Sequence, residues 1–361
     1  MKLEKQNILF LTRTMNLGGT ENVILQLCEI LSSKVNKIIV CSCGGVNVEK
    51  LDKMGIKHYV ISDIASKKPD VIFRTFIQIR KIIKDEKITV IHSHHRMAAL
   101  YAEIIADKDI VKIANAHNTF HDKKWLTKFA YRNTNLIAVG EMVKRNLTDY
   151  FKLSQNQVEV IHNAVKPFEK NIEKIEILNQ EKQKGYTLIG NIGRLSEQKG
   201  MEYFIYAASK THKINSKVKF IIVGEGEDKE KLKELVRQKR IEEYVMFLGY
   251  RSDIQNVISQ MDFIVLSSLW EGLPLTPIEA FSVGKTVIAT NVDGTPEIVQ
   301  DGENGYLVEP KDVDGLAKKM EYLSKDVNKR KELAKKAKKR YEEQFSFDQL
   351  VQKYVSYYER L

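Results

Sequence analysis

Short runs of consecutive apolar residues alternate along the chain with longer stretches of helical spacing. In the first half these runs are 7–12, 37–43, 59–62, 89–94, 111–117, 135–140 and 158–163. In the second half they are 186–194, 217–226, 245–250, 262–268 and 285–291. Such runs are typical of parallel strands that helices cover on both faces. The pattern therefore predicts an α/β protein with two Rossmann-like parallel-sheet domains.

The length of 361 residues also favours two domains. The segment 166–185 is charged, lacks strand character and separates the two series of strands, so we place the domain boundary there. A Lys/Glu-rich helical region begins near Lys329 and is interrupted around Phe345-Ser346-Phe347. A last helix then runs to Leu361.

The composition is that of a globular protein, with 43% hydrophobic and 29% charged residues. The N-terminal stretch has no signal-peptide core, and no apolar run approaches the ~20 residues of a membrane-spanning helix. We therefore expect a soluble, cytoplasmic protein. Cys28, Cys41 and Cys43 have no zinc-site spacing and are expected to be free thiols in a reducing compartment.

The net charge of +11, from 58 basic and 47 acidic residues, indicates an anionic partner. Nucleotide phosphates, an anionic membrane surface and nucleic acid all fit this charge. No zinc finger, RNP motif or basic region with interleaved aromatics occurs, which argues against nucleic acid. The basic-aromatic stretches 73–84 and 121–132 could contact anionic lipid, or could be ordinary helices with lysines on their solvated face.

Open parallel sheets bind ligands beyond the carboxyl ends of their strands, so residues just after strands are candidates for a site. After the first strand, Gly18 and Gly19 allow close approach of the backbone to a ligand, ahead of a helix from about Thr20 to Leu31. An ordinary strand-to-helix turn is the alternative. The spacing is not G-x-G-x-x-G, which argues against a dinucleotide fingerprint.

The second series opens with NIGRLSEQKG, in which Arg194 and Lys199 follow a strand. A guanidinium fork and a mobile ammonium together suit a diphosphate. In the later GEGEDKEKL (224–232), acids follow the glycines and the third glycine is missing, so we interpret it as a tight turn whose acids favour a helix N-terminus. Tyr250 and Arg251 could border a nucleobase, and Ser252 or Asp253 could be an N-cap.

The stretch SLWEGLPLTPIEA (268–280) carries two glutamates. Thr276-Pro277-Ile278-Glu279 reads as a capping box, with Thr276 at the N-cap and Glu279 at N3. Glu271 has no such capping role, and a carboxylate beside phosphates is favourable where it accepts hydrogen bonds from sugar hydroxyls. The pair fits poorly with the acid and base of a hydrolase, which must face one bond.

Histidines follow two strands of the first series. His117 ends the run VKIANAH and is expected to face a ligand, although a lone histidine is more often structural. The tract His92, His94 and His95 resembles a metal site but has no accompanying carboxylate, so packing at a strand end is the preferred interpretation.

Taken together, these residues resemble the retaining GT-B glycosyltransferases of glycosyltransferase family 4, whose E-x7-E signature matches Glu271 through Glu279. The resemblance covers nearly the whole chain. It includes Gly18-Gly19-Thr20-Glu21, VIHNAV (160–165), GRLSEQKG (193–200), VGEGEDKEKL (223–232), GYRSDI (249–254) and DGTPEIVQDGENGYLVEP (293–310). One departure is His162-Asn163-Ala164, where relatives usually have Pro-Asn-Gly. The tight turn there depends less on glycine, so the resemblance does not specify the conformation of the hinge.

The resemblance implies two Rossmann-like domains facing a central cleft, with the last helix crossing back to the first. Residues 1–165 plus 346–361 would bind the acceptor, and 166–345 the nucleotide-sugar. The roles it implies follow residue by residue. Arg194 and Lys199 would hold the diphosphate, with help from Gly19 and the backbone of Leu275 and Thr276. Glu279 would accept hydrogen bonds from the ribose hydroxyls and Glu271 from the donor sugar, and His117 would lie near that sugar. Tyr250 and Arg251 would border the base, and donor binding would also include Gly18, Gly272 and Leu273. The catalytic set would be Glu271, His117, Arg194 and Lys199.

In this family's chemistry, negative charge grows on the leaving diphosphate, and Arg194, Lys199 and a helix N-terminus would stabilise it without a metal or other cofactor. The strings Asp107-Lys108-Asp109 and Asp312-Val313-Asp314 do not follow strands, so we expect no metal there.

We therefore expect transfer of a hexose or N-acetylhexosamine from a UDP-sugar to a lipid-linked glycan in cell-surface polysaccharide synthesis, at the inner face of the plasma membrane. The alternatives are a nucleotide-sugar epimerase on the same scaffold and a non-catalytic sugar-nucleotide-binding subunit.

Overall fold

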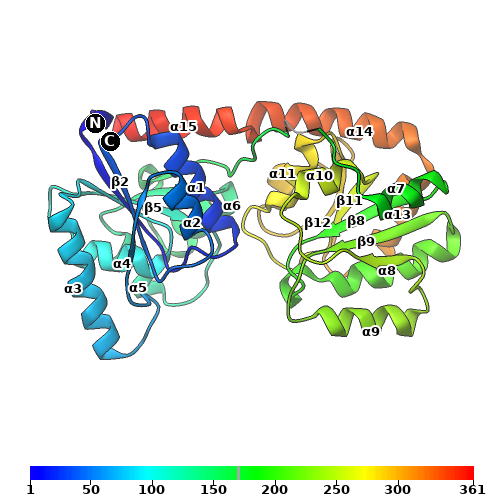
Figure 1. Ribbon diagram of the computed structural model, residues 1–361, viewed down its shortest axis with the longest axis horizontal. Coiled ribbons are helices and arrows are strands. Elements are labelled where there is room, and N and C mark those ends of the chain that lie inside the picture. Colours follow the sequence, from blue (N-terminus) through cyan, green and yellow to red (C-terminus); the bar gives the residue numbers. More distant parts are fainter. Residues whose placement is uncertain (169–170) are drawn as a thin grey trace. The chain divides into compact units, whose positions relative to one another are not determined.

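The computed structural model describes residues 1–168 and 171–361, and the chain divides into two compact units (Figure 1). The first comprises Met1–Asn163 with Leu350–Leu361, and the second comprises Ala164–Gln349. Glu169 and Lys170, within the segment predicted as the boundary, lie outside the described residues.

The first unit is built on a seven-stranded parallel sheet with the order β3-β2-β1-β4-β5-β6-β7. Its strands are β1 (Asn7–Leu11), β2 (Lys37–Ser42), β3 (Lys57–Val60), β4 (Val90–Ser93), β5 (Val111–Ala116), β6 (Asn135–Ala138) and β7 (Val158–Val160). Its helices are α1 (Gly19–Leu31), α2 (Val48–Lys53), α3 (Pro69–Asp85), α4 (Arg96–Ile105), α5 (Lys124–Tyr131) and α6 (Glu141–Arg145). The strand order reverses between β1 and β4, which is where an open sheet binds its ligand.

The second unit has a six-stranded parallel sheet with the order β10-β9-β8-β11-β12-β13. Its strands are β8 (Thr187–Ile192), β9 (Val218–Val223), β10 (Val245–Phe247), β11 (Phe263–Leu266), β12 (Val287–Thr290) and β13 (Gly305–Val308). Its helices are α7 (Glu176–Gln183), α8 (Met201–Ile214), α9 (Lys229–Lys239), α10 (Ile254–Ser259), α11 (Leu275–Ser282), α12 (Thr295–Ile298), α13 (Val313–Lys325) and α14 (Val327–Arg340). Here the order reverses between β8 and β11.

The prediction of two parallel sheets in one α/β chain is confirmed. Eleven of the twelve apolar runs contain a whole strand, and the run at 59–62 contains the last two residues of β3. The strand β13 was missed, because its four residues follow a turn-rich sequence and provide too short an apolar run. Cys28, Cys41 and Cys43 are free, as expected. No helix among the described residues has both the length and the apolar character needed to cross a bilayer.

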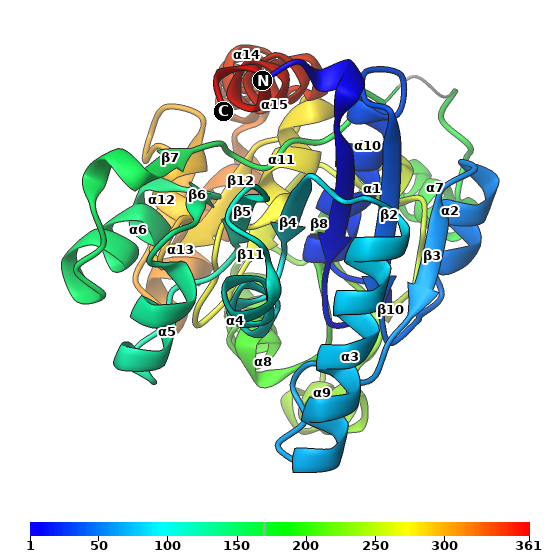
Figure 2. The ribbon, with the colours of Figure 1, turned by 90° about the vertical axis from the view of Figure 1, so that its left-hand side faces the viewer.

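Both faces of the first sheet are buried. Alternate residues such as Leu9 and Ile91 pack with apolar residues of α3 and α4, which cover one face (Figure 2). The residues between them point to the other face, since successive strand side chains alternate. There the ring of Phe10 lies 5.4 Å from the ring of His92, and the ring of His92 lies 5.9 Å from that of Tyr358. The last helix, α15 (Phe347–Arg360), therefore covers this second face.

A buried hydrogen-bond chain attaches α15 to the first unit. The Tyr358 hydroxyl lies 2.6 Å from His92 Nδ1, and His92 Nε2 lies 2.7 Å from Asn115 Oδ1. Asn115 Nδ2 donates to the Tyr354 hydroxyl over 2.6 Å. Residues from Leu350 onward belong to the first unit, whereas α14 belongs to the second, so the expected return of the last helix is confirmed.

We predict that Tyr358→Phe lowers the free energy of unfolding of the first unit by about 1–3 kcal/mol, because it leaves a buried nitrogen of His92 without its donor. Tyr357→Phe is the matched control: Tyr357 is buried on the same helix, and its hydroxyl has no hydrogen-bond partner among the described residues. Urea denaturation of both variants measures the difference. Equal losses would show that the hydrogen bond adds nothing.

Candidate active site

An ion pair joins the two strands at which the second sheet reverses its order. Lys199 lies in a short 3-10 helix after β8, and Glu271 lies in the loop after β11. Lys199 Nζ is 2.6 Å from Glu271 Oε1, and the Ser268 hydroxyl donates to the same oxygen over 2.6 Å. Glu271 is only 7% exposed. Two residues predicted for the site thus contact each other directly, and each neutralises the charge of the other.

The loop after β12 makes hydrogen bonds to the backbone of Glu271 and Gly272. The sequence analysis did not predict this contact. Asp293 Oδ2 accepts the Glu271 N–H over 2.7 Å, and the Gly294 N–H donates to the Gly272 carbonyl over 3.0 Å. A Cβ at Gly294 would lie 2.2 Å from that carbonyl oxygen, so only glycine fits. Asp293 itself has φ +41°, a conformation that costs about 1–3 kcal/mol in a residue with a side chain. The Asp293-Gly294 pair, which follows the apolar run at 285–291, is the sequence feature that could have predicted this turn.

The predicted capping box is wrong. Helix α11 begins at Leu275, one residue before the expected N-cap, with Pro274 as its N-cap residue and no side-chain cap hydrogen bond. The Thr276 hydroxyl instead points to the Ile192 carbonyl of β8, at 3.5 Å. A cap is less needed here because Pro277, the third helical residue, has no N–H to satisfy. Glu279 therefore lies one turn inside the helix.

The Glu279 carboxyl has no hydrogen-bond partner among the described residues. Burial raises the pKa of Glu279 to about 7, and the positive charge of Lys199 opposes this rise only partly. An unpaired, desolvated carboxyl is costly for a fold, so such groups concentrate where a ligand completes them. Glu279 and Lys199 are thus electrostatic neighbours in the same part of the second unit.

Arg194 projects from the loop after β8 and is largely exposed. Its guanidinium pairs with Glu227, whose carboxylate lies 3.1 Å away, and this exposed contact contributes little to stability. The turn that contains Gly224 packs its backbone directly on this loop, since a Cβ at Gly224 would lie 1.9 Å from the Gly193 carbonyl oxygen. The glycines of GEG therefore serve backbone packing, which agrees with the tight turn predicted from the sequence.

Tyr250 and Arg251 follow β10. The Tyr250 ring is exposed. The Arg251 guanidinium makes two hydrogen bonds to the Asp253 carboxylate, of 2.8 and 2.6 Å. Asp253 is the N-cap residue of α10, but its side chain makes no cap bond and is used for Arg251 and Asn256. Only part of the donor set of Arg251 remains for a nucleobase.

In the first unit, α1 begins at Gly19 with Gly18 as its N-cap residue. The Glu21 carboxylate lies over this loop, where one oxygen accepts from the Thr14 hydroxyl over 2.9 Å. The other oxygen lies 2.4 Å from the position of a Cβ on Gly18. An acid thus stands beside the helix N-terminus at which the sequence suggested phosphate contacts.

Histidines lie beyond the neighbouring strands β4 and β5. His94 Nδ1 is 3.1 Å from His117 Nε2, and the two rings are stacked with centroids 5.4 Å apart. Burial, with a smaller effect from His95, lowers the pKa of His117 to about 4, so its imidazole is neutral. His92 makes the buried contacts with α15. Among the described residues, no group of three histidine, cysteine or carboxylate side chains is placed to hold a metal ion.

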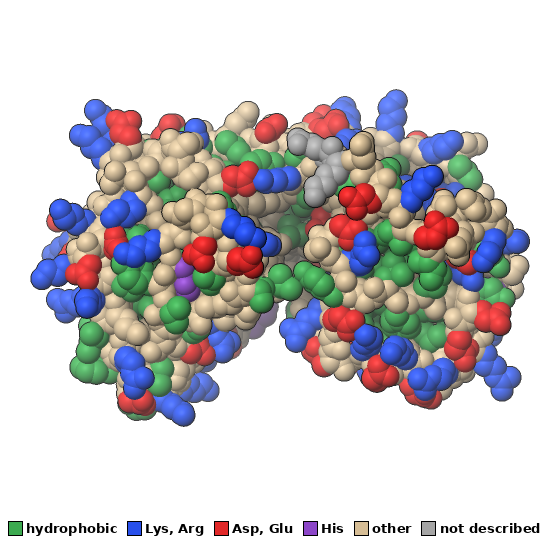
Figure 3. Space-filling view, viewed as in Figure 1, with side chains coloured by type: hydrophobic (Ala, Val, Ile, Leu, Met, Phe, Trp, Pro, Cys, Tyr) green, Lys and Arg blue, Asp and Glu red, His purple; other side chains and the backbone are tan. Residues whose placement is uncertain are grey.

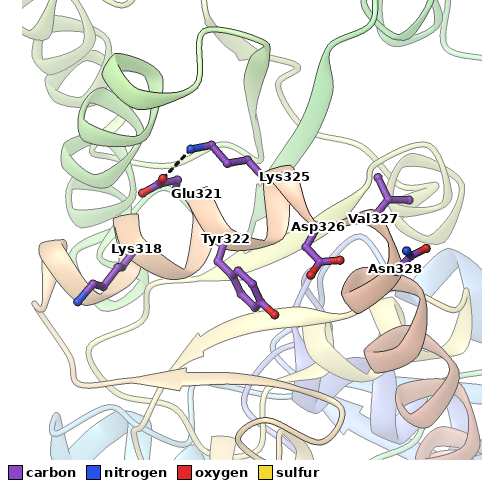
Figure 4. A pocket seen from close by; sticks show the side chains of 7 residues that line it. All are labelled: Lys318, Glu321, Tyr322, Lys325, Asp326, Val327 and Asn328. Carbon is purple, nitrogen blue, oxygen red and sulfur yellow. Dashed lines mark hydrogen bonds and ion pairs between the residues drawn. The ribbon is translucent and has the colours of Figure 1, made fainter.

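Two surface hollows differ in their position relative to these strand ends. The first, between α13 and α14, contains none of the predicted residues and includes the ion pair of Lys325 with Glu321 (Figure 4). The second, of about 450 Å³, lies in the first unit next to His95 and the start of α5. Its walls are mainly carbon, from residues such as Ile72, Met97 and Phe120, and Lys67 and Lys123 border it.

Comparisons with known proteins identify the class and then the family. The chain's fold is that of GT-B glycosyltransferases: the structure of a glycosyltransferase from Rickettsia africae superposes with a TM-score of 0.84 at 23% identity over 98% of both chains. The Anabaena protein HepE in complex with UDP gives 0.85 at 20% identity over 99% of this chain and 100% of that one.

Sequence models of two families match the chain, "Glycosyltransferase Family 4" over residues 17–167 and "Glycosyl transferases group 1" over 172–340. The chain therefore belongs to the family 4 type of glycosyltransferase. One relative is the Escherichia coli UDP-Gal:alpha-D-GlcNAc-diphosphoundecaprenol alpha-1,3-galactosyltransferase, 28% identical over 83% of each chain.

The raised pKa of Glu279 predicts how stability depends on pH. A carboxyl whose pKa is higher in the folded state, near 7, than in the unfolded state, near 4.5, binds more protons when folded. Its contribution to stability is therefore complete below about pH 4.5 and is lost as the pH rises towards 7. Glu279→Gln should remove this loss, so that the variant without ligand melts at a higher temperature than the wild type at pH 8.

Thermal midpoints measured from pH 4.5 to pH 8 test this. Glu303→Gln, at an exposed position, is the control and should follow the wild type. A Glu279→Gln curve that runs parallel to the wild-type curve would contradict the raised pKa.

Proposed function

We propose that this protein is a retaining glycosyltransferase that moves a hexose or N-acetylhexosamine from a UDP-sugar to a lipid-linked glycan. The observation that carries the donor part is the Lys199–Glu271 pair beside the unpaired Glu279, at the point where the second sheet reverses. A site for a diphosphate next to a polyol needs a cation and hydrogen-bond acceptors together, and this set supplies them.

Binding of the donor would exchange partners within this set. A diphosphate offers Lys199 more negative charge than Glu271 does, so Lys199 turns to the phosphates and leaves a Glu271 oxygen open to a sugar hydroxyl. Arg194 likewise leaves its exposed contact with Glu227 and binds the diphosphate with its planar fork. Glu279 accepts hydrogen bonds from the ribose hydroxyls, which provide the partners that its carboxyl lacks.

The chemical step breaks the bond between the anomeric carbon and the diphosphate oxygen, and the electron pair leaves with UDP. Arg194 and Lys199 stabilise that growing charge, which is the role of preorganised cations in such reactions and requires no metal. The acceptor hydroxyl attacks on the face that the diphosphate leaves, and its proton passes to the departing phosphate oxygen. The configuration at the anomeric carbon is therefore retained.

Two comparisons support the choice of UDP and of a lipid-linked acceptor. HepE was crystallised with UDP, and the Escherichia coli relative is named for UDP-Gal and for an acceptor with a diphosphoundecaprenol. The hollow of the first unit suits such an acceptor: its carbon-rich walls fit a lipid segment, and Lys67 and Lys123 fit a phosphate. Lys123 also has φ +46°, so the backbone beside this hollow is strained.

The face of the first unit beside this hollow suits an anionic membrane. Phe73 on α3 and Trp125 on α5 are 67% and 77% exposed. Exposed lysines and arginines follow on both helices, including Arg80, Lys81 and Lys84 at the end of α3. Figure 3 shows hydrophobic side chains next to cationic ones over the region that Figure 1 labels α3. Aromatic rings can enter the headgroup region while the cations contact anionic lipid.

The first test is UDP release from a panel of UDP-, GDP- and ADP-sugars without acceptor. We expect slow release from a UDP-sugar, lowered about 10- to 100-fold by Arg194→Ala or Glu271→Gln because both remove transition-state contacts. Arg237→Ala is the matched control, since Arg237 is also an exposed arginine paired with a glutamate of the second unit. Glu279→Gln should mainly weaken UDP binding, whereas Glu271→Gln should mainly lower kcat.

Small and equal effects of the two glutamate variants would contradict the donor assignment. Conversion of the donor sugar without net UDP release would identify an epimerase, and UDP binding without turnover of any donor, even with a lipid-linked glycan present, would identify a binding subunit.

The second test is flotation with vesicles of phosphatidylglycerol and phosphatidylcholine. The double variant Phe73→Ser/Trp125→Ser should lose at least half of the bound fraction, and 1 M salt should weaken binding of the wild type. Ile214→Ser, at a 58% exposed position of the second unit, is the control and should bind normally. Equal binding by all three proteins would contradict membrane contact through this face.

A further inference from the structure

His94 and His117 share one hydrogen bond, and its direction follows from the surroundings of His94. His94 Nδ1 faces His117 Nε2 at 3.1 Å, whereas His94 Nε2 is buried and has no partner among the described residues. A proton on that Nε2 would be an orphan donor, and buried N–H groups without acceptors are rarer than unused acceptor atoms. The proton of His94 is therefore on Nδ1, and it is donated to His117 Nε2.

Both rings have to be neutral for this assignment, and their environment makes them so. Burial lowers the pKa of His94 well below its usual value, and the nearby His92 and His117 lower it further. The pKa of His117 is lowered to about 4 by burial and by His95. Burial lowers the pKa of His95, the charges of Arg13 and Arg96 lower it further, and Asp63 opposes them.

A neutral His117 that accepts at Nε2 must carry its own proton on Nδ1. That nitrogen has no hydrogen-bond partner among the described residues, and the side chain is only partly buried. His117 therefore presents an N–H donor, rather than a lone pair, beyond the carboxyl end of β5.

The ring of His94 is held by its neighbours on the same face of the sheet. His92, two residues earlier on β4, has its ring centroid 4.5 Å away, and Phe10 of β1 lies 5.7 Å away. His92 is itself fixed: Tyr358 donates to its Nδ1, and its Nε2–H donates to Asn115. Since Asn115 lies on β5 two residues before His117, the network that anchors α15 also fixes both strand ends that carry the histidine pair.

We propose that His94 is a positioning residue, which fixes His117 as the Nδ1–H tautomer so that His117 donates a hydrogen bond to a substrate oxygen beyond the carboxyl end of β5. This inference rests on the proposed function for the identity of that substrate. The tautomer itself is a property of the protein without ligand, and it can be measured separately.

The experiment is a long-range ¹H–¹⁵N correlation spectrum of the histidine rings, at pH 7.5, together with donor kinetics. We expect His117 to show a protonated Nδ1 and an unprotonated Nε2 in the wild type. His94→Phe, which keeps an aromatic ring but loses the hydrogen bond, should give a mixture of His117 tautomers. It should also lower kcat about 10- to 100-fold with a smaller change in KM for the donor.

His94→Asn keeps an amide N–H near the position of Nδ1 and should recover most of the lost kcat and the single tautomer. His121→Phe is the matched control, since His121 is an exposed histidine of the same unit, and it should behave as the wild type. A wild-type His117 protonated at Nε2, or a His94→Phe enzyme with normal kcat and one tautomer, would overturn the proposal. If no donor is turned over by the wild type, the proposed function fails while the spectrum still decides the tautomer.

Discussion

The ion pair of Lys199 with Glu271 organises the second unit's strand ends. It joins loops that come from β8 and β11, on either side of the reversal in strand order, and it lies almost out of solvent. Ser268 and Asp293 add hydrogen bonds to the carboxylate and to its backbone. Removal of one partner of such a pair leaves a buried charge, at a cost of about 3–5 kcal/mol. Without a ligand, the pair therefore keeps two functional groups in place by satisfying one with the other.

The ion pair leaves one carboxyl in the same part of the second unit without a partner, and this unpaired group indicates a ligand site. Lys199 is satisfied by Glu271, and nothing among the described residues then remains to pair with Glu279. A fold selected for stability alone would replace such groups with apolar ones, since buried polar atoms without partners destabilise. Glu279 lies one turn inside α11, the helix that follows β11, and open sheets bind ligands beyond the carboxyl ends of their strands.

The sequence predicted the sheets better than the details of the site. Twelve apolar runs became strands because a strand that is buried on both faces must be apolar throughout, and this requirement is visible in one segment at a time. The start of α11 was misplaced because Thr276 does not cap the helix: its hydroxyl points to the Ile192 carbonyl of β8, and Pro274 is the N-cap residue. Asp293 was missed because its contact with Glu271 joins loops after different strands. Pairings across loops depend on sheet order, which local sequence does not encode.

Charged groups and neutral imidazoles lie beyond different strands of the two sheets. Arg194, Lys199 and Glu271 carry full charges beyond the strands of the second unit. Beyond β4 and β5 of the first unit, burial keeps the imidazoles of His94 and His117 neutral, whereas Arg13 and Asp63 form an ion pair beyond β1 and β3. In the proposed reaction, negative charge grows on the leaving diphosphate and positive charge grows on the sugar. Cations belong beside the diphosphate. A charged imidazolium near the sugar would repel its developing positive charge, whereas a neutral N–H donor can orient a sugar oxygen without that cost.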